Sequence, residues 1–392
     1  MESFKYLIVG GGMTADSAVK GIRKVDPQGS IGLISQEEDP PYNRPPLSKA
    51  LWKGKDLETI WRGTEARGTT LHLGRRVTAI EPKTRQVKDE QGQLYSYEKL
   101  LLATGARPRR LDDDGGSVIY FRTAADYRIL RSLADQGREF VVIGGGYIGS
   151  EISAALAMNG LRVTLVFPEA GIGARVFPTD LAEHLVGYYR EKGVDVRSGR
   201  TVSGISSEGE MQVLSLTGGE LLRAGAVVAG LGVLPNTRLA IDAGLDIDDG
   251  IRVNPNLQTS DPDIYAAGDV ASFENPDLAT RVRVEHEDNA NTMGELAGRS
   301  MAGEEIHYDR LPYFYSDLFD LGYEAVGLVA YRLQTYADWS EPYRKGVVYF
   351  LEQRRVRGVL LWNVWDQVEA ARALIREQGP FKPEDLAGRL PK

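Results

Sequence analysis

Two stretches of the chain repeat one plan, in which an apolar run leads through a glycine-rich turn into an amphipathic segment. The apolar runs cover residues 6–9 and 140–143, and the turns cover residues 10–15 and 144–149. After each turn, apolar residues recur every three or four positions, which predicts a helix with one buried face. Those faces are formed by Ala15, Ala18, Val19 and Ile22 in the first stretch and by Ile148, Ile152, Ala155 and Leu156 in the second, whose helix should stop at Asn159-Gly160.

Further apolar runs suited to buried strands lie at residues 30–35, 100–102, 163–167, 227–229 and 264–267. Strands that alternate with helices are typical of α/β proteins with parallel sheets. The end of the chain has another pattern, because aromatic residues are spread through short strands at 346–351 and 357–362 before a helix over 366–376. We therefore expect an α/β fold with two Rossmann-like domains and a separate α+β domain at the C-terminus.

Each glycine-rich turn has the G-x-G-x-x-[GA] spacing of a dinucleotide cradle. The first glycine makes the tight turn, the second lets backbone N–H groups approach a pyrophosphate, and the third small residue lets helix and strand pack closely. A carboxylate after the next strand then accepts a hydrogen bond from a ribose hydroxyl. One such turn is as readily explained by packing alone, but two copies, each with its own acid, indicate two bound dinucleotides. The residues concerned are Gly10, Gly12, Ala15 and Glu37 in the first copy and Gly144, Gly146, Gly149 and Glu169 in the second.

Composition narrows the chemistry that two dinucleotides could serve. The chain has 392 residues, of which 44 are glycine and none is cysteine. Without cysteine it can form no disulfide, no thiolate metal site, no cysteine nucleophile and no redox-active dithiol. Redox chemistry must then belong to bound cofactors, and the natural pair is a flavin and a nicotinamide, which exchange a hydride directly. Thiol–disulfide reductases, peroxidases and CoA-disulfide reductases are excluded on the same ground.

Charge and hydropathy limit the expected partners. Lys and Arg number 47 against 55 Asp and Glu, a formal net charge of −8, which argues against nucleic acid as a main partner. No apolar run approaches the ~18 residues of a membrane span, and the chain enters its first strand with no room for a signal peptide, so a cytoplasmic protein is expected. No metal site is expected either, because His72, His184 and His307 lack ligand spacing. Among oligomers, a two-fold homodimer is the default expectation.

Several short motifs connect these features to a known family. They are Ala103-Thr104-Gly105 and Tyr265-Ala266-Ala267-Gly268-Asp269, together with residues 41–49 (PYNRPPLSK), 284–290 (VEHEDNA), 322–327 (GYEAVG) and 358–363 (GVLLWN). In these motifs and in both cradles the chain resembles the FAD- and NAD(P)H-dependent pyridine-nucleotide oxidoreductases of the glutathione-reductase fold. Within that family it is most similar to the apoptosis-inducing factor branch and, one step further away, to ferredoxin and rubredoxin reductases. We accordingly expect an FAD-binding domain at 1–112 and 236–308, an NAD(H)-binding domain at 113–235 and a C-terminal domain at 309–392.

The resemblance also implies which residues hold each cofactor. At FAD it implies contacts from Gly10, Gly12, Thr14, Ala15, Glu37, Arg44, Lys49, Val77, Thr104, Gly105, Arg109, Gly268 and Asp269, with Glu285, His286 and Tyr315 near the ring. At NADH it implies Gly144, Gly146, Tyr147, Ile148, Gly149, Glu169, Arg175, Gly232, Glu285, Glu324 and Asn363. Lys49 and Glu151 are implied to form an ion pair beside N5 of the flavin, where a fixed cation stabilises the charge gained on reduction. Taken without the resemblance, that pair has an ordinary surface ion pair as its alternative, and His286 has a packed or capping role.

Three departures from the family pattern change single expectations. Gln36 stands where relatives often carry an acid, which shifts the ribose contact to Glu37. Tyr315 replaces a tryptophan, so ring packing against the flavin is expected with different electronics. Only residues 331–344 occupy the place of the long insertion of eukaryotic apoptosis-inducing factors, so a cell-death or DNA-binding role is not supported.

Glu169 also bears on the choice of nicotinamide, because a carboxylate accepts from a 2′-hydroxyl and repels a 2′-phosphate. NADH is therefore favoured over NADPH, although Arg175 could attract a phosphate. The leading hypothesis is an FAD-dependent NADH:acceptor oxidoreductase similar to apoptosis-inducing factor, in which hydride passes from C4 of NADH to N5 of the flavin and a charge-transfer complex forms. The acceptor is left open as a quinone, oxygen or a small iron–sulfur protein. Two alternatives are the reductase component of a chain that feeds ferredoxin or rubredoxin, and a redox-controlled binding protein whose shape or dimerisation responds to NADH.

Overall fold

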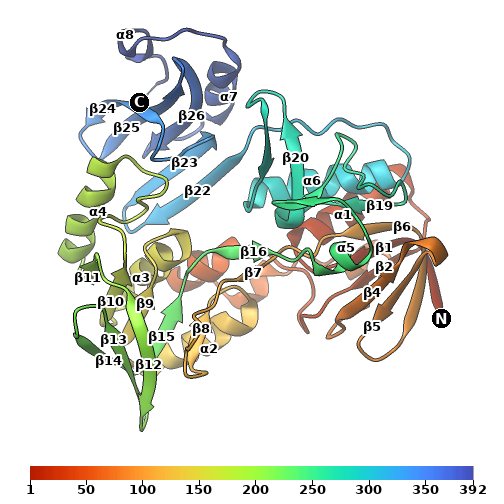
Figure 1. Cartoon of the computed structure of the whole chain (residues 1–392), viewed down its shortest axis with the longest axis horizontal. Coiled ribbons are helices and arrows are strands. Elements are labelled where there is room, and N and C mark those ends of the chain that lie inside the picture. The colour runs from red at the N-terminus through yellow and green to blue at the C-terminus, as the bar shows by residue number, and fades with distance from the viewer. Residues whose placement is uncertain (392) are drawn as a thin grey trace. The chain divides into compact units, whose positions relative to one another are not determined.

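The computed structural model describes residues 1–391 and divides the chain into two compact units. Unit 1 is built from Met1–Arg44, Leu57–Arg107 and Leu234–Pro312, and unit 2 from Pro45–Asp56, Pro108–Val233 and Tyr313–Lys392. Each unit contains a parallel sheet with helices, which confirms the expected α/β class with Rossmann-like parts (Figure 1). The finer division into three domains stays a prediction.

Unit 1 is organised around a seven-stranded sheet of order β3-β2-β1-β6-β5-β4, in which β19 also pairs with β6. The strands β1, β2, β3, β6 and β19 run parallel, whereas β5 is antiparallel to both of its neighbours, β6 and β4. β5 pairs with the first half of β6, and β19 with its last residues. The bounds are β1 Glu2–Val9, β2 Ile31–Ile34, β3 Thr69–His72, β4 Val77–Glu81, β5 Gln86–Asp89, β6 Leu94–Leu102 and β19 Ile264–Ala266.

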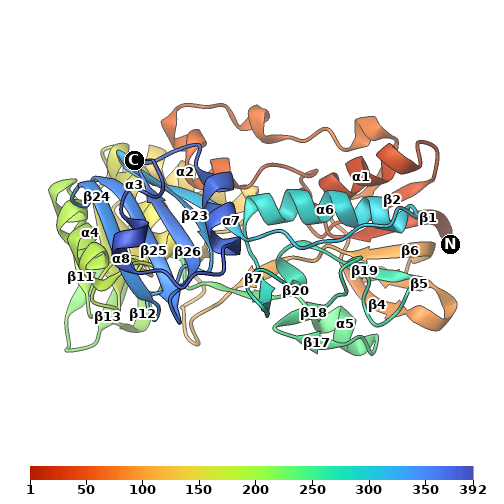
Figure 2. The same cartoon turned by 90° about the horizontal axis from the view of Figure 1, so that it is seen from above.

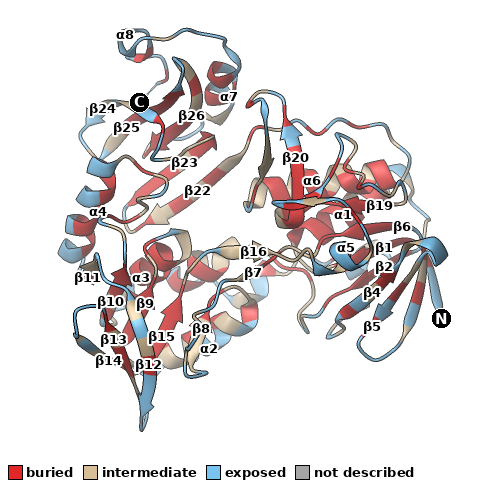
Figure 3. Ribbon diagram, in the orientation of Figure 1, coloured by how far each residue is buried: buried red, intermediate tan, exposed pale blue. Residues whose placement is uncertain are grey.

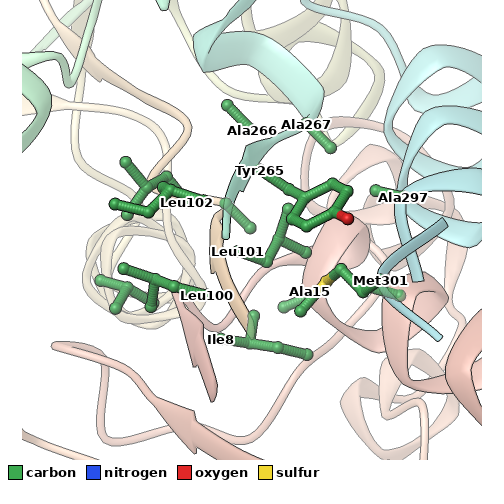
Figure 4. Packing of buried hydrophobic residues seen from close by; sticks show 14 of the residues in the cluster. Ile8, Ala15, Leu100, Leu101, Leu102, Tyr265, Ala266, Ala267, Ala297 and Met301 are labelled. Carbon is green, nitrogen blue, oxygen red and sulfur yellow. The ribbon is translucent and has the colours of Figure 1, made fainter. Parts of the chain in front are cut away.

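The core of unit 1 is formed where strands that are distant in the sequence become neighbours. Ile8 of β1 lies opposite Leu101 of β6, and Leu101 lies opposite Tyr265 of β19. Figure 4 shows these side chains with Ala15 and Met301, all of them buried. The predicted apolar face of the first helix is confirmed, because the four residues of that face have no exposed surface. Figure 3 shows buried residues in red along this helix, α1.

Two helices of unit 1 pack closely because glycines line their contact. α1 spans Met13–Val25 and α6 spans Glu287–Met301. A Cβ atom on Gly21 would lie 2.0 Å from the carbonyl oxygen of Glu295, and one on Gly298 would lie 2.1 Å from that of Ala18. Part of the glycine excess therefore serves helix–helix approach, a use that the two glycine-rich turns alone did not account for.

A buried carboxylate joins α1 to a later segment of unit 1. The side chain of Asp16 is fully buried and lies 2.7 Å from Lys20 Nζ, 2.6 Å from Arg62 Nε and 3.1 Å from Arg67 Nη1. The hydroxyl of Thr64 also donates to it at 2.7 Å. Although burial opposes ionisation, hydrogen bonds from Lys20, Thr64 and Arg62 hold the pKa of Asp16 below its usual value.

The rest of unit 1 consists of short elements. A four-stranded sheet has the order β17-β18-β20-β21. Its bounds are β17 Ile247–Asp248, β18 Gly250–Arg252, β20 Ala271–Asn275 and β21 Thr280–Arg283. The short helices are η3 Leu57–Ile60, η4 Glu65–Arg67, η5 Pro82–Thr84, α5 Arg238–Asp242 and η6 Gly268–Val270. β7 Ala106–Pro108 pairs with β16 Val233–Pro235, and each of these two strands has residues assigned to both units.

Unit 2 contains the second parallel sheet, of order β11-β10-β9-β15-β8. The predicted runs at 140–143 and 163–167 are β9 Phe140–Ile143 and β10 Val163–Phe167. The other strands are β8 Val118–Tyr120, β11 Asp195–Ser198 and β15 Ala226–Ala229, and the helices are α2 Ala124–Asp135, α3 Tyr147–Met158 and α4 Thr179–Glu191.

Unit 2 also contains a three-stranded antiparallel sheet, formed by β12 Val202–Glu208, β13 Met211–Leu216 and β14 Leu221–Ala224. α3 ends before Asn159 as predicted, but Ile148 of its apolar face is only half-buried.

The end of the chain forms a five-stranded antiparallel sheet of order β22-β23-β26-β25-β24 with two helices, which confirms the predicted α+β part (Figure 2). The bounds are β22 Tyr313–Leu318, β23 Leu321–Gly327, β24 Gln334–Glu341, β25 Lys345–Glu352, β26 Arg355–Trp362, α7 Val368–Arg376 and α8 Pro383–Leu386. α7 begins two residues later than expected because Asp366 has a φ of +62°, outside the helical region. Trp362 is fully buried and stacks on Tyr323.

The segment Pro45–Asp56 also belongs to unit 2 and carries two short helices, η1 Pro45–Ser48 and η2 Ala50–Lys53. Asn159 at the end of α3 donates a hydrogen bond to the carbonyl of Trp52 at 3.1 Å. This contact holds the segment next to α3. Among residues 1–391, no helix is both long enough and apolar enough to cross a lipid bilayer.

Candidate functional site

The first cradle has the geometry that its spacing predicts. Gly10 has a φ of +127°, and a Cβ there would lie 2.1 Å from the carbonyl oxygen of Ala103, so only glycine fits. Gly12 precedes α1 without a side-chain cap, and the nearest atom to a Cβ at this position is Arg44 Nη2 at 4.0 Å. The first N–H groups of α1 are therefore left for an anion, and the space in front of them is open.

The second cradle repeats this arrangement in unit 2. Gly144 has a φ of +109°, and a Cβ on it would lie 2.4 Å from the carbonyl oxygen of Gly230. A Cβ on Gly149 would lie 1.8 Å from the carbonyl oxygen of Gly144, whereas a Cβ on Gly146 would meet nothing within 4 Å. α3 also begins without a side-chain cap. Both cradles thus fit the pyrophosphate of a dinucleotide.

The carboxylate of Glu37 follows β2 and is held by two neighbours. Its Oε1 accepts from Arg44 Nη2 at 2.5 Å, and its Oε2 accepts from the hydroxyl of Tyr42 at 2.6 Å. Each carboxylate oxygen can accept two hydrogen bonds, so both retain capacity for a ribose hydroxyl. Arg44, expected at FAD, is placed beside this carboxylate.

The motif that contains Asp269 packs directly against the first cradle. A Cβ on Gly268, where φ is +78°, would lie 2.3 Å from Thr14 Oγ1, so these two predicted residues are in contact. Asp269 belongs to η6, and its carbonyl accepts a hydrogen bond from Arg283 Nη1 at 3.1 Å. The same Nη1 atom donates to Glu285 Oε1 at 2.5 Å, which fixes the acid that precedes His286.

His286 is the residue immediately before α6. Burial lowers its pKa to about 4, although the nearby carboxylates of Asp269 and Asp288 oppose the shift. The imidazole is consequently neutral near pH 7. In that form it can accept or donate a single hydrogen bond at a bound ring.

Several predicted FAD residues have roles within the protein itself. Thr104 Oγ1 donates to the carbonyl of Asn236 at 3.0 Å, and Asn236 Nδ2 donates to the carbonyl of Thr104 at 2.8 Å. The carbonyl of Gly105 accepts from the N–H of Asn236. Val77 is buried in the core of unit 1. These contacts leave the predicted cofactor roles of Thr104, Gly105 and Val77 as predictions.

Arg109 and Gly232 were expected at different cofactors, yet they are neighbours in unit 2. The N–H of Arg109 donates to the carbonyl of Gly232 at 2.9 Å. Gly232 has a φ of +83°, which favours glycine. The side chain of Arg109 is exposed.

Glu169 follows β10 and pairs with Arg175. Both the Nε and Nη2 atoms of Arg175 lie 3.0 Å from Glu169 Oε1. Oε2 is not used by this pair and can accept from a ribose hydroxyl. The arginine side chain is 81% exposed, so its guanidinium is held by the acid at the surface.

Lys49 and Glu151 form a buried ion pair within unit 2 rather than a surface pair. Their Nζ and Oε1 atoms are 2.6 Å apart, and the two side chains are only 13% and 5% exposed. Two serine hydroxyls that the sequence reasoning missed complete the cluster, since Ser48 Oγ donates to Oε2 at 2.6 Å and Ser316 Oγ donates to Oε1. The ammonium also lies 5.6 Å from the ring centre of Tyr315. The structure thus brings together the predicted catalytic pair and Tyr315.

Tyr147 and Glu324, both expected at NADH, lie on α3 and on β23 of the C-terminal sheet. The ring of Tyr147 packs edge-on against Phe314 at 5.2 Å. Glu324 Oε1 accepts from the hydroxyl of Tyr313 at 2.8 Å, whereas Oε2 is buried with no hydrogen-bond partner. Burial raises the pKa of Glu324. The orphaned oxygen is suited to a polar group of a ligand.

The side chain of Asn363 is committed to the fold. Its Oδ1 accepts from the N–H of Gly322 at 2.7 Å, and its Nδ2 donates to the carbonyl of Arg344 at 2.9 Å. These bonds hold a turn in which Asn363 has a φ of +49°. The backbone N–H of Asn363 also donates to the carbonyl of Gly322 at 2.7 Å, and a contact from Asn363 to NADH stays a prediction.

His72 and His184, which lie outside the motifs, pack against aromatic rings. His72 packs edge-on against Phe4 and Tyr95, and His184 stacks on Tyr343. Over residues 1–391, no group of three or more His, Cys, Asp or Glu side chains is arranged to hold a metal ion.

Comparison with known proteins extends these observations to the whole chain. The sequence model of the family described as pyridine nucleotide-disulphide oxidoreductase matches residues 4–294, and that of the apoptosis-inducing factor, mitochondrion-associated, C-terminal family matches residues 337–377. Apoptosis-inducing factor 1, mitochondrial, of Dictyostelium discoideum is 33% identical over 98% of this chain and 80% of its own. The anthranilate 1,2-dioxygenase system ferredoxin–NAD(+) reductase component of Burkholderia cepacia is 34% identical over 99% of this chain and 98% of its own. In the solved structure of the covalent putidaredoxin reductase–putidaredoxin complex, a chain of 31% identity matches with a TM-score of 0.91 over 98% of this chain and 95% of that one.

Proposed function

The chain belongs to the pyridine nucleotide-disulphide oxidoreductase family, and on that premise we propose that it oxidises NADH through bound FAD and delivers the electrons to a small iron–sulfur protein of the ferredoxin type. It is an FAD-dependent NAD(P)H oxidoreductase. Because its 392 residues contain no cysteine, the disulphide chemistry in the family's name is not available to it. Electrons must therefore pass from the flavin to an acceptor outside the chain.

The observation that carries the proposal is the buried ammonium of Lys49, held at 2.6 Å from Glu151. When bound, FAD supplies a ring that takes up a hydride and releases electrons one at a time. Lys49 would stand at the N5 edge of that ring and stabilise the negative charge that gathers there. Glu151 keeps the ammonium from turning away, and Tyr315 packs beside it. The first cradle would bind the pyrophosphate of FAD and the second that of NADH.

The overall reaction balances without any thiol. One NADH yields a hydride, which is two electrons and a proton. Two oxidised iron–sulfur proteins take one electron each, NAD⁺ is released, and the proton goes to solvent. No residue of the chain changes its oxidation state at the end of the cycle.

NADH rather than NADPH is the proposed donor. Glu169 Oε2 is available to a 2′-hydroxyl, while a 2′-phosphate at the same place would meet a carboxylate. Arg175 does not reverse this preference, because its guanidinium is bonded to that same carboxylate.

The proposed acceptor is supported by length and charge. The Burkholderia relative that is named a ferredoxin–NAD(+) reductase component matches this chain from end to end. Ferredoxin-type proteins are usually acidic, and Lys53 and Lys55 are exposed on the segment that carries Lys49. These lysines would steer an acidic protein towards that segment.

Anaerobic titration with NADH tests the first half of the proposal. NADH should bleach the oxidised flavin with a long-wavelength charge-transfer band, and NADPH should do so at much higher concentration. A protein that holds no flavin, or a flavin that NADH leaves oxidised, would overturn the proposal. The second half is tested by comparing NADH-dependent reduction of a [2Fe–2S] ferredoxin with that of a quinone and of oxygen. Charge reversal by Lys53→Glu and Lys55→Glu should slow only the ferredoxin step, increasingly so at low salt.

A second candidate function follows from the match of residues 337–377 to the C-terminal family of apoptosis-inducing factors. In this reading NADH locks the protein in a reduced form whose altered shape or dimerisation is the signal. Its mass in solution should then change when NADH is added anaerobically, while turnover with every acceptor stays slow. An unchanged mass together with rapid ferredoxin reduction would exclude it.

A further inference from the structure

The buried carboxylate of Glu151 is bonded by side chains from two separate segments of unit 2. Ser48 and Lys49 both bond Glu151, the first through Oε2 and the second through Oε1, each at 2.6 Å. On β22, Ser316 donates to Oε1, and its neighbour Tyr315 has its ring 5.6 Å from the Lys49 ammonium. All four partners and Glu151 belong to unit 2. The carboxylate therefore accepts three hydrogen bonds while its side chain is 5% exposed.

The two serines supply donors to both carboxylate oxygens, which Lys49 alone does not do. An ion pair through Oε1 satisfies one oxygen, but a second oxygen buried without a donor would lose its hydration with nothing in return. A carboxylate held at one oxygen can also rotate about its last torsion, which is soft. Donors on both oxygens fix the plane of the group, and the position of the ammonium is fixed with it.

The Ser316 hydroxyl lies in a buried part of the C-terminal sheet. Ser316 has one proton, which it gives to Glu151, so towards other groups it acts as an acceptor. Tyr323 lies opposite Ser316 on the neighbouring strand β23 and is buried with 2% exposure. Tyr189 does not replace Ser316 as a donor to Glu151, because its hydroxyl donates to the carbonyl of Ser150 at 3.1 Å.

We propose that Ser48 and Ser316 are positioning residues of the flavin reaction, which hold the Glu151 carboxylate so that the Lys49 ammonium stays in one place. This inference rests on the proposed function, in which Lys49 faces the flavin. Neither serine touches the reacting atoms; each acts through Glu151. Loss of Ser48 should change the flavin potential more than loss of Ser316. When Ser316 is lost, Oε1 still accepts from Lys49, whereas loss of Ser48 removes the serine donor of Oε2.

The test uses the FAD-loaded enzyme and measures the midpoint potential of the flavin as well as the rate of its reduction by NADH. Ser48→Ala should lower the equilibrium constant for flavin reduction about tenfold, a shift of about 30 mV for a two-electron couple. Ser316→Ala should shift the potential in the same direction by less, with the KM for NADH unchanged in both. Ser48→Thr, which keeps the hydroxyl, should restore most of the potential. The matched control is Ser300→Ala in unit 1, a buried serine bonded to the carbonyl of Asn256, which should leave the potential unaltered.

A double-mutant cycle separates positioning from a merely structural role. In a Lys49→Met background, Ser48→Ala should no longer shift the potential, because the ammonium on which it acts is absent. Equal shifts with and without Lys49, or no shift in either serine variant while Lys49→Met has one, would overturn the inference and leave the proposed function standing. No shift from Lys49→Met itself would instead refute the role of Lys49 in the proposed function. If an alanine variant fails to hold FAD, Ser48→Cys and Ser316→Cys, which keep the volume but lose the strong donor, are measured in its place.

Discussion

Two glycines of the second cradle, three positions apart, should respond to the same substitution in opposite ways. A methyl group added at Gly149 would fall 1.8 Å from the carbonyl oxygen of Gly144, about half of an ordinary van der Waals separation. A methyl group added at Gly146 would meet no protein atom within 4 Å, and the backbone there, with φ −85°, suits alanine. The room at Gly146 is the room through which a pyrophosphate approaches the N-terminus of α3. We therefore expect Gly149→Ala to damage folding and Gly146→Ala to damage binding.

The size of each effect follows from what the new methyl group meets. Overpacking costs typically about 1–3 kcal/mol, and the upper end applies at Gly149 because its obstacle is backbone that cannot rotate away. For a unit of this size that corresponds to a fall in Tm of about 6–12 °C. At Gly146 the free energy of unfolding should change by less than about 0.5 kcal/mol. The affinity for NADH should nevertheless fall by about tenfold or more, since a loss of only about 1.4 kcal/mol suffices.

Thermal unfolding of each variant without nucleotide, and the KM for NADH with ferredoxin or a dye as acceptor, provide the two readouts. The first cradle offers a natural reference, because Ala15 occupies the place that corresponds to Gly149 and is fully buried. A methyl group is thus excluded at Gly149 by the approach of Gly144 and not by the motif itself. The reasoning is refuted if Gly146→Ala lowers the Tm as much as Gly149→Ala does, or if it leaves the KM for NADH unchanged.

Three further predictions concern single charged or titratable groups. Burial lowers the pKa of His286 to about 4, so between pH 6.5 and 4 the unfolded chain binds a proton that the folded chain does not, and stability falls as the pH falls across that window. His286→Asn should remove about 2 kcal/mol of the stability loss between pH 7 and pH 5, measured by urea unfolding at both pH values. Asp16→Asn should cost about 3–5 kcal/mol of unfolding free energy, because Arg62 and Arg67 lose a buried counter-charge, and an unchanged urea midpoint would contradict it. Glu169→Gln should narrow the ratio of kcat/KM for NADH over NADPH by about tenfold, and an unaltered ratio would show that the acid does not contact the ribose.

The two cradles could be predicted because their information is local. Six consecutive residues contain the glycine of the tight turn, the glycine that leaves room for a pyrophosphate and the small residue at the helix–strand contact. The structure places Gly10, Gly12 and their counterparts in the first two of these roles. The close contact between α1 and α6 could not be predicted in this way. It depends on Gly21 and Gly298, which are far apart in the sequence, and nothing in either stretch says that the two helices meet. The glycine excess was visible in the composition, but its division between turns and helix packing required the fold.

The cluster around Glu151 could be predicted in part. The sequence pattern indicates that Glu151 is buried, but not which residues bond it. Glu151 stands one residue before Ile152 and four before Ala155, so a helix through this stretch puts an acid on its apolar face. A carboxylate in that position must be paired and hydrogen-bonded, which already disfavours the surface ion pair that remained as an alternative for Lys49. What the pattern could not supply is which donors arrive, because serine hydroxyls have no characteristic spacing and Ser316 reaches Glu151 from a strand of another part of the chain. An acid on an apolar helix face therefore predicts that hydrogen-bond donors surround it, and only the structure identifies those donors.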